Sequence, residues 1–231
     1  MKQAGPLITL LAPVIGHFKV GLELFVARGD ASIQAIKTAG GRIMLDLKLH
    51  DIPETVKRAA QAAASKGDHI DFITAHAAGG KEMLKAAVEG AHNGNPNTDI
   101  LAITVLTSED LAVLEETGVT DVSVMAVVKR RALMAQEAGC CGVVASAQEA
   151  GELRKLLGPD MLIIVPGIRN PDGDAADQKR IGTPEAAIGD GASALVVGRP
   201  IRDAEDPRAA AEGFVAQIAA KLATMEQGAQ S

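Results

Sequence analysis

The sequence predicts an α/β fold of the (β/α) TIM-type barrel class, and two observations carry this prediction. Short runs of apolar, β-branched residues alternate with Ala-rich stretches of helical periodicity, which is the pattern of parallel strands covered by helices. The alternation is regular over 231 residues, which favours a closed barrel over an open doubly wound sheet. With 47% hydrophobic residues the chain can bury a sizeable core, and it fits one α/β domain as well as two small ones; we interpret it as one domain over residues 1–231.

Seven strands are expected from the apolar runs, whereas the common barrel has eight, so the N-terminal strand is missing from this count. The run Leu7–Leu11 is apolar, but about five residues separate it from the next run, and a parallel crossover needs about a dozen, so we expect a helix there. Either the chain begins inside the first βα unit, or the barrel is seven-stranded or rearranged. The expected strands are His17–Leu22, Arg42–Lys48, Phe72–Ala75, Ile100–Val105, Gly142–Ala145, Leu162–Val165 and Ala194–Val197.

Helices are expected between the strands, where Ala-rich segments end near Gly or Asn. A long irregular stretch, Gly167–Thr183, is rich in Pro, Gly and Asp, and a loop of this length in a compact domain is usually functional. The expected helices are Thr55–Lys66, Lys81–Ala91, Ser123–Ala138, Ala147–Leu157 and Pro207–Met225.

Composition and charge exclude several classes of protein. Aromatic residues make up 2% of the chain, without Trp or Tyr, and the net charge is -6, so binding to nucleic acid is disfavoured. No apolar run reaches the roughly 18 residues of a membrane span, and the start lacks a signal-peptide layout, so we expect a cytoplasmic protein. Cys140 and Cys141 are adjacent, too close in the chain for an ordinary disulfide, and are expected to be reduced.

Charged residues are concentrated where the second expected strand ends, in residues 46–55 (DLKLHDIPET). Strand alternation places Asp46 and Lys48 on one face, which in a barrel can be the interior, at the rim where active sites lie. Opposite charges a few ångströms apart keep each other ionised there, so the segment predicts a preset electrostatic site. The alternative interpretation is a buried ion pair that only orients the end of the strand.

A phosphate site is predicted from the last two expected strands. Barrel enzymes often hold phosphate with the loops after their final strands, and here these loops carry Arg169, then Gly198 and Arg199. Glycine lets a backbone N–H approach an oxyanion closely, and a guanidinium can donate two hydrogen bonds to it. By contrast, no metal site is expected, because four of the histidines share no helical or strand spacing typical of metal ligands: His17, His50, His69 and His92.

Residues 46–55 resemble the D-x-K-x-x-D-I-P-x-T motif of the orotidine 5'-monophosphate decarboxylase family, and the resemblance covers nearly the whole chain. It extends to FKVG at 18–21, HAAGG at 76–80, TVLTS at 104–108, PGIR at 166–169 and VGRP at 197–200. It implies cofactor-independent decarboxylation of orotidine 5'-monophosphate to uridine 5'-monophosphate in de novo pyrimidine biosynthesis, by a homodimer. The family usually begins with a strand that ends in a ribose-contacting Asp, and this element has no counterpart before Pro6.

The resemblance also implies the roles of individual residues. Lys19, Asp46, Lys48 and Asp51 would form the charged array, with Asp51 reaching the partner subunit's site. Ile52 and Thr55 would join Asp51 across the dimer interface. The substrate's pyrimidine would lie at Thr107, and its phosphate would be held by Arg169, Gln178, Gly198 and Arg199.

Two other functions remain open from the sequence. A non-catalytic or impaired paralogue would retain phosphate binding or dimerisation. A magnesium-dependent enzyme of the hexulose-phosphate synthase and ketogulonate-phosphate decarboxylase type shares the D-x-K-x-x-D core. Such enzymes resemble one another in having a Glu metal ligand where this chain has Lys19, and Ala-Gly where it has Ile52 and Pro53, and a cation at position 19 would repel magnesium.

Overall fold

The computed structural model describes residues 4–120, 123–169 and 182–229. The chain divides into two compact units. The first unit comprises Met1–Ile103 and Met134–Cys141, and the second comprises Thr104–Leu133 and Gly142–Ser231. The expectation of a single domain stays a prediction.

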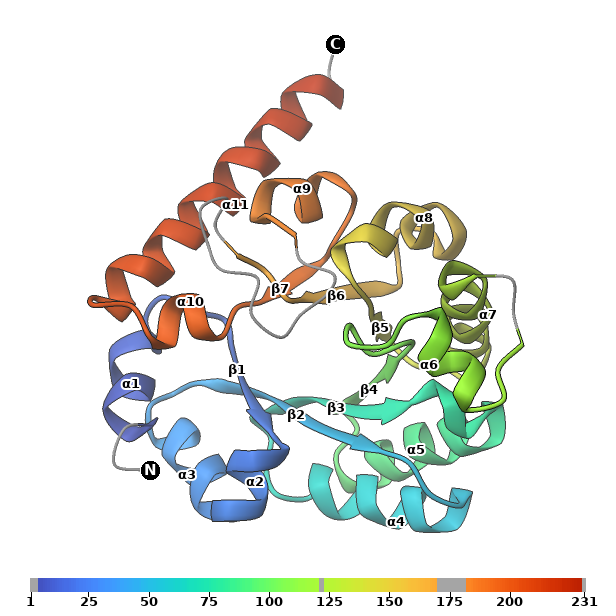
Figure 1. Ribbon diagram of the computed structural model, residues 1–231. Helices are drawn as coiled ribbons and strands as arrows, with labels where there is room; N and C mark the ends of the chain where they lie inside the picture. Colours follow the sequence, from blue (N-terminus) through green and yellow to red (C-terminus); the bar gives the residue numbers. More distant parts are fainter. Residues whose placement is uncertain (1–3, 121–122, 170–181, 230–231) are drawn as a thin grey trace. The chain divides into compact units, whose positions relative to one another are not determined.

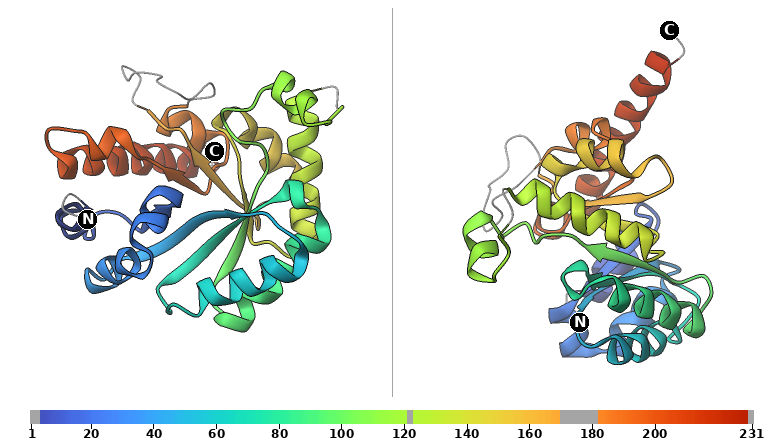
Figure 2. Two further views of the ribbon diagram at one scale, coloured as in Figure 1. Left: turned by 60° about the horizontal axis from the view of Figure 1, so that its bottom comes forward. Right: turned by 90° about the vertical axis from the view of Figure 1, so that its right-hand side faces the viewer.

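The first unit contains four parallel strands and the helices that connect them (Figure 1). Neighbouring strands pair in chain order, with Lys19 opposite Met44 and Phe72 opposite Asp99. In Figures 1 and 2, α4 and α5 lie side by side on the outer side of these strands. The elements are α1 (Ala4–Leu11), β1 (His17–Gly21), α2 (Leu22–Arg28), α3 (Asp30–Thr38), β2 (Arg42–Leu49), α4 (Pro53–Ala64), β3 (Ile70–His76), the 3-10 helix η1 (Ala77–Gly79), α5 (Lys81–Gly94) and β4 (Asp99–Ile103).

The second unit continues the alternation with three parallel strands. β5 pairs with β6 and β6 with β7, so that Ile164 lies opposite Ala194. Helix α11 packs against α9 and α10. The elements are α6 (Leu111–Glu116), β5 (Gly142–Val144), α8 (Ala147–Leu157), β6 (Leu162–Pro166), α9 (Pro184–Gly189), β7 (Ala194–Val196), α10 (Arg199–Arg202) and α11 (Pro207–Ala229), while α7 (Val124–Glu137) has residues in both units.

The fold class is confirmed as a TIM-type (β/α) fold, because seven parallel strands follow one another in chain order with helices between them. The helix expected at Leu7–Leu11 is confirmed by α1. Within the described ranges no strand precedes β1. The expected helix at Thr55 begins two residues earlier, since Pro53 occupies the first turn, where a missing N–H costs nothing.

Aliphatic side chains fill the core, as the near absence of aromatic residues requires. Ile43, Leu45 and Ile73 are fully buried in the strands of the first unit, and Leu153 and Ile163 are fully buried in the second. β-branched side chains such as those of Ile43, Ile73 and Ile163 favour extended backbone and pack well on a pleated surface, which favours strands in these segments, whereas Leu153 packs from helix α8.

Both cysteines are free thiols, Cys140 buried and Cys141 half-buried. Burial raises the pKa of the Cys140 thiol to about 12, and it raises the pKa of Cys141 as well. Thiolates are the reactive form, so both side chains are inert at neutral pH and serve in packing.

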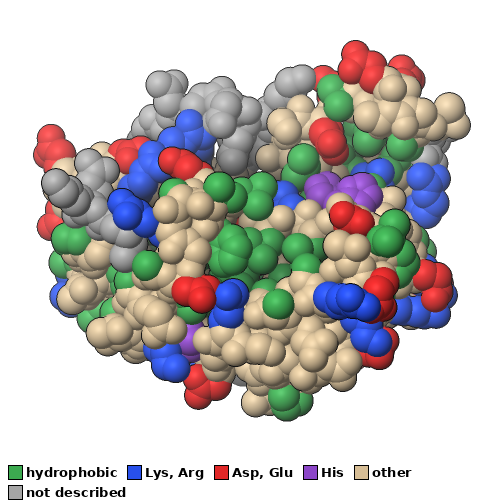
Figure 3. All heavy atoms as spheres, turned by 90° about the horizontal axis from the view of Figure 1, so that it is seen from below, with side chains coloured by type: hydrophobic (Ala, Val, Ile, Leu, Met, Phe, Trp, Pro, Cys, Tyr) green, Lys and Arg blue, Asp and Glu red, His purple; other side chains and the backbone are tan. Residues whose placement is uncertain are grey.

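The surface carries charges of both signs close together, as the face in Figure 3 shows. Among the helices in the described ranges, none combines the length and hydrophobicity needed to span a lipid bilayer.

Candidate active site

A buried carboxylate between two ammonium groups forms the centre of the candidate site in the first unit. Asp46, in β2, is 7% exposed. Its Oδ1 accepts a hydrogen bond of 2.7 Å from Nζ of Lys48, and its Oδ2 lies 3.2 Å from Nζ of Lys19 in β1. The hydroxyl of Thr74 in β3 donates to Asp46 Oδ1 at 3.1 Å. Three adjacent strands therefore supply the Asp46 cluster, which comprises Lys19, Asp46, Lys48 and Thr74.

The lysines keep Asp46 ionised despite its burial. Burial alone would raise the pKa of this carboxyl, because a charge is poorly solvated away from water. The positive charge of Lys19 and the hydrogen bond from Lys48 outweigh that effect and hold the pKa of Asp46 below its ordinary value. Two ammonium groups and one carboxylate leave one net positive charge, which favours an anionic ligand.

Lys48 reaches Asp46 through an irregular backbone and not through regular strand alternation. Its φ of 51° is the only positive value at a non-glycine position in the described part of the chain. The register of β2 against β3 shifts between Leu45 and Leu49, and the N–H of Lys48 donates to Thr74 Oγ1 at 2.8 Å. A left-handed backbone costs a residue with a side chain about 1–2 kcal/mol. The predicted meeting of Asp46 and Lys48 is confirmed, but a bulge produces it.

Gly21 leaves the space in which the Lys19 ammonium lies. Gly21 follows Lys19 by two residues in β1 and is paired with Asp46 in the parallel register. A Cβ atom on Gly21 would lie 2.9 Å from Nζ of Lys19. Any side chain at position 21 therefore requires the ammonium to move relative to Asp46.

The remaining predicted residues of the first unit lie outside the Asp46 cluster. Asp51 is exposed, and its Oδ1 accepts a 2.7 Å hydrogen bond from the N–H of Ile52. Ile52 is 66% exposed, and Thr55 is exposed in the first turn of α4. Of the four charged residues predicted as one array, this unit thus brings three together and leaves Asp51 apart.

The second unit carries the residues predicted for the pyrimidine and the phosphate. Arg169 follows β6 and is 8% exposed, its N–H donating to the carbonyl of Gly182 at 3.0 Å. Gly198 and Arg199 follow β7, which pairs with β6, so the two arginines follow adjacent strand ends. Gln178 lies outside the described residues.

Thr107 is half-buried in the segment after β4, and this segment is held from both sides. Arg131 of α7 donates from Nη1 to the carbonyl of Thr104 at 2.7 Å. Glu109 accepts the N–H of Leu106 at 3.1 Å. The side chains of Arg131 and Glu109 therefore hold the backbone at Thr104 and Leu106, directly before Thr107.

Thr74 and Gly21 are absent from the predicted site residues. Thr74 is the only hydroxyl in the predicted strand Phe72–Ala75. Because a buried hydroxyl needs a hydrogen-bond partner, its position in this apolar strand could have predicted a contact with a polar group. Gly21 lies within the FKVG segment, but its proximity to an ammonium depends on the side-chain path of Lys19, which no sequence pattern gives.

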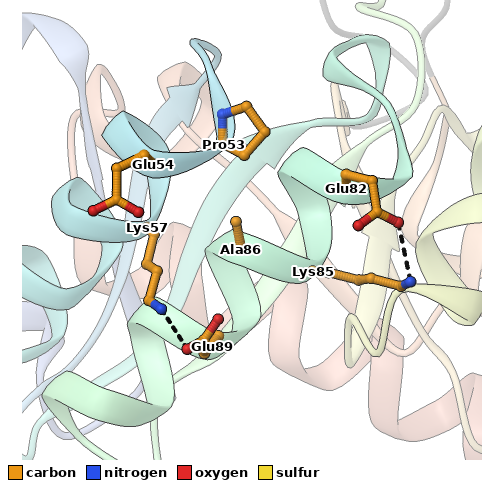
Figure 4. Close-up of a pocket in the computed structure, with 7 residues that line it drawn as sticks. All are labelled: Pro53, Glu54, Lys57, Glu82, Lys85, Ala86 and Glu89. Carbon is orange, nitrogen blue, oxygen red and sulfur yellow. Dashed lines mark hydrogen bonds and ion pairs between the residues drawn. The ribbon is translucent and has the colours of Figure 1, made fainter.

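A pocket of about 510 Å³ on the first unit lies between α4 and α5 (Figure 4). Its lysines are paired with its glutamates, Lys57 with Glu89 and Lys85 with Glu82, the latter at 3.0 Å. None of the predicted site residues lines it. Across the described ranges, no three His, Cys, Asp or Glu side chains are grouped so as to hold a metal ion.

These features define a TIM-type (β/α) protein with a lysine–aspartate cluster on its first strands and arginines after its last two. The chain belongs to the orotidine 5'-phosphate decarboxylase / HUMPS family, whose model matches residues 1–214.

Individual relatives agree with this assignment. The chain is 47% identical to an orotidine 5'-phosphate decarboxylase from Anaeromyxobacter sp. (strain K), over 93% of this chain and 92% of the relative. It is also 47% identical to an orotidine 5'-phosphate decarboxylase from Moorella thermoacetica, over 92% of this chain and 85% of that relative.

Solved structures agree in fold. The crystal structure of orotidine 5'-phosphate decarboxylase from Lactobacillus acidophilus has a TM-score of 0.77 at 40% identity, covering 87% of this chain and 85% of that one. The crystal structure of orotidine 5'-phosphate decarboxylase from Pyrococcus horikoshii OT3 has a TM-score of 0.74 and covers 94% of this chain and 93% of that one. At 24% identity it supports the fold alone.

Proposed function

We propose that this protein is a carboxy-lyase that converts orotidine 5'-monophosphate to uridine 5'-monophosphate without a cofactor, in de novo pyrimidine biosynthesis in the cytoplasm. The observation that carries the proposal is the Asp46 cluster, in which Lys48 is held 2.7 Å from a buried carboxylate. The names of the relatives, which match over most of the chain, supply the substrate.

The chemistry requires a cation at the reacting carbon. Loss of carbon dioxide from C6 of the pyrimidine leaves an electron pair on a carbon that has no conventional electron sink. The ammonium of Lys48 stabilises this charge as it develops and then donates a proton to C6. Asp46 lies beside the departing carboxylate and, with Lys19, fixes the ammonium in place. Because Asp46 stays ionised when buried, the electrostatic arrangement exists before substrate binds.

The second unit supplies binding in this proposal. Thr107 contacts the pyrimidine, and Arg169, Gln178, Gly198 and Arg199 hold the phosphate, which is remote from C6. A phosphate held at a distance from the reacting carbon contributes binding energy that orients the substrate and favours exclusion of water.

We propose further that the active form is a homodimer in which Asp51, Ile52 and Thr55 contribute to the partner's site. Their exposure supports this proposal, because an isolated subunit leaves 66% of the apolar Ile52 in water and leaves Asp51 away from the Asp46 cluster. A dimer interface at this segment would bury the apolar surface of Ile52 and bring Asp51 to a second subunit.

The magnesium-dependent alternative is disfavoured by Lys19. A divalent cation bound by Asp46 would have to displace or lie beside the ammonium, whose Nζ is 3.2 Å from Asp46 Oδ2. The relatives named above are orotidine 5'-phosphate decarboxylases, although the family description also covers the HUMPS enzymes.

The test is to follow orotidine 5'-monophosphate by its ultraviolet absorbance with a chelator of divalent metals present. We expect conversion to uridine 5'-monophosphate at an unchanged rate with and without chelator. Absence of conversion together with tight binding of the nucleotide would identify a non-catalytic paralogue, and activity that is abolished by chelator would identify the metal-dependent class. Either result refutes the proposal.

A further inference from the structure

Two histidine rings stack where β2 and β3 end. His50 directly follows β2, and His76 is the last residue of β3. The two strands are neighbours, with Leu49 paired to Ala75, so the rings come from adjacent strand ends. Their centroids are 5.6 Å apart and their planes are inclined by 29°.

The ring of His50 is also packed against the turn that follows β3. A Cβ atom placed on Gly79, in η1, would come within 3.1 Å of Cδ2 of His50. Two consecutive parts of the chain, the end of β3 and η1, therefore contact one imidazole. His50 is exposed as a residue, but neighbours on two sides of its ring limit the orientations that the ring can adopt.

The segment that carries His50 connects the residues assigned to chemistry. Lys48 precedes His50 by two residues and Asp51 follows it directly. Lys48 is anchored by its hydrogen bond to Thr74, and Ile52 begins α4 by accepting the N–H of Val56 at 3.1 Å. Between these anchors the side chain of Asp51 bonds only to the adjacent Ile52 among the contacts of the described residues.

We propose that His50 is a positioning residue: stacked on His76 and packed against η1, it fixes the segment between Lys48 and α4 and thereby sets where Asp51 is presented. The ring itself makes no contact with substrate in this proposal. The requirement is for a flat aromatic surface, so phenylalanine can replace histidine at position 50. The kinetic part rests on the proposed function, whereas the positioning part can be measured without any substrate.

The experiment compares the full-length protein with His50→Ala, His50→Phe and, as a matched control, His92→Ala, which removes an exposed histidine of α5. Amide hydrogen exchange is measured by mass spectrometry on the peptide that covers residues 48–56. We expect about tenfold faster exchange in His50→Ala, and exchange like that of the unmodified protein in His50→Phe and His92→Ala.

Kinetics on orotidine 5'-monophosphate then separate positioning from binding. We expect kcat of His50→Ala to fall about tenfold or more with KM little changed, and His50→Phe to recover most of it. If His50→Ala does not fold, His50→Gln, which lacks the ring but retains a long side chain, takes its place.

The proposal is overturned by unchanged exchange and kcat in the ring-less variant, by faster exchange without loss of kcat, or by His50→Phe being as impaired as His50→Ala. If the unmodified protein shows no turnover, the proposed function fails, and the exchange pattern alone still supports or refutes the positioning role.

Discussion

Lys48 is the side chain on which the proposed chemistry depends most directly. Replacing it with alanine removes both the charge that stabilises the carbanion and the proton donor, so we expect Lys48→Ala to lower kcat by at least about 10⁴-fold. Arg199→Ala removes a proposed phosphate contact, and we expect mainly a higher KM. Steady-state kinetics on both variants check this, and similar mild losses in the two would contradict the assigned roles.

Gly21 tests whether the position of the Lys19 ammonium matters. In Gly21→Ala the new Cβ would lie 2.9 Å from Nζ of Lys19, so the ammonium must shift from its present position beside Asp46. We expect kcat/KM to fall about tenfold while the melting temperature changes little. Gly16→Ala is the matched control, because nothing lies within 4 Å of a Cβ there. Equal activity of the two variants would show that the position of Lys19 is not critical.

His69 is expected to make the stability of the first unit sensitive to acid. It is 7% exposed, neither ring nitrogen has a hydrogen-bond partner, and Asp68 Oδ1 is 3.7 Å from its Nδ1. Burial, and then the charge of Lys37, lower the pKa of His69 below its ordinary value of 6.5. The folded state therefore keeps the ring neutral in a pH range where the unfolded state binds a proton.

The sign of the effect follows from this difference in proton binding. The contribution of the neutral His69 ring to stability is fully present above pH 6.5. It is lost as the pH falls from that value through the lowered pKa of the folded state. We expect the melting temperature to drop between pH 7.5 and 5.5, and the drop to be smaller in His69→Leu than in the unmodified protein. Thermal unfolding at both pH values measures it, with His92→Leu as the exposed control. An unchanged drop in His69→Leu would assign the acid sensitivity to other groups.

At the scale of elements, one arginine joins several loops of the second unit. Arg154 of α8 donates to the carbonyls of Gly158, Pro159 and Met161 before β6. It also donates to the carbonyl of Gly191 and the hydroxyl of Ser193 before β7. Nη1 shares its two N–H groups among the three carbonyls before β6, while Nε and Nη2 face the acceptors before β7, so one planar guanidinium bonds both segments.

We expect Arg154→Ala to lower the free energy of unfolding by at least about 3 kcal/mol, since several carbonyls lose a charged donor. Arg154→Lys would recover little, because a single ammonium cannot reach all of these acceptors. Urea denaturation measures both. Arg208→Ala is the control, as Arg208 forms an exposed pair with Glu212. A loss as small as that of the control would mean that water replaces the arginine.

Most elements could be predicted from the sequence, and the failures have physical causes. Ala147–Leu157 was expected as a helix and is one, because Ser146 precedes it and Glu149 accepts the N–H of Ser146. Short helices such as α2 and α6 were not expected, since six or seven residues give no clear period. The bulge at Lys48 depends on Thr74 of a neighbouring strand, which local sequence does not reveal.

The candidate site divides in the same way. Alternation along β2 predicted that Asp46 and Lys48 meet, and they do, but the left-handed backbone at Lys48, which alternation does not include, brings them together. The contribution of Lys19 came only through the family resemblance, since it lies in another strand and alone resembles an ordinary strand-end charge. The proposed roles of Asp51 and Arg199 remain predictions that rest on their positions in the family pattern.

At the scale of the whole molecule, the proposed homodimer predicts complementation between two inactive variants. If Asp51 acts in the partner's site, a heterodimer of Lys48→Ala and Asp51→Ala subunits contains one intact site and one with both changes. Random mixing makes half of the dimers heterodimers, so about one quarter of full activity is expected. Activity is measured after unfolding and refolding the mixture. If the mixture is no more active than the Lys48→Ala and Asp51→Ala homodimers together, Asp51 acts in the site of its own subunit or in neither site.

At Lys48 the left-handed backbone favours glycine, whereas the proposed chemistry requires a cationic side chain. Glycine adopts this conformation without penalty, whereas lysine holds it at a cost and contributes the ammonium. Replacing Lys48 with glycine would relieve the backbone strain and would remove the ammonium at the same time. In the proposed mechanism, the ammonium is the reason that this left-handed position carries lysine instead of glycine.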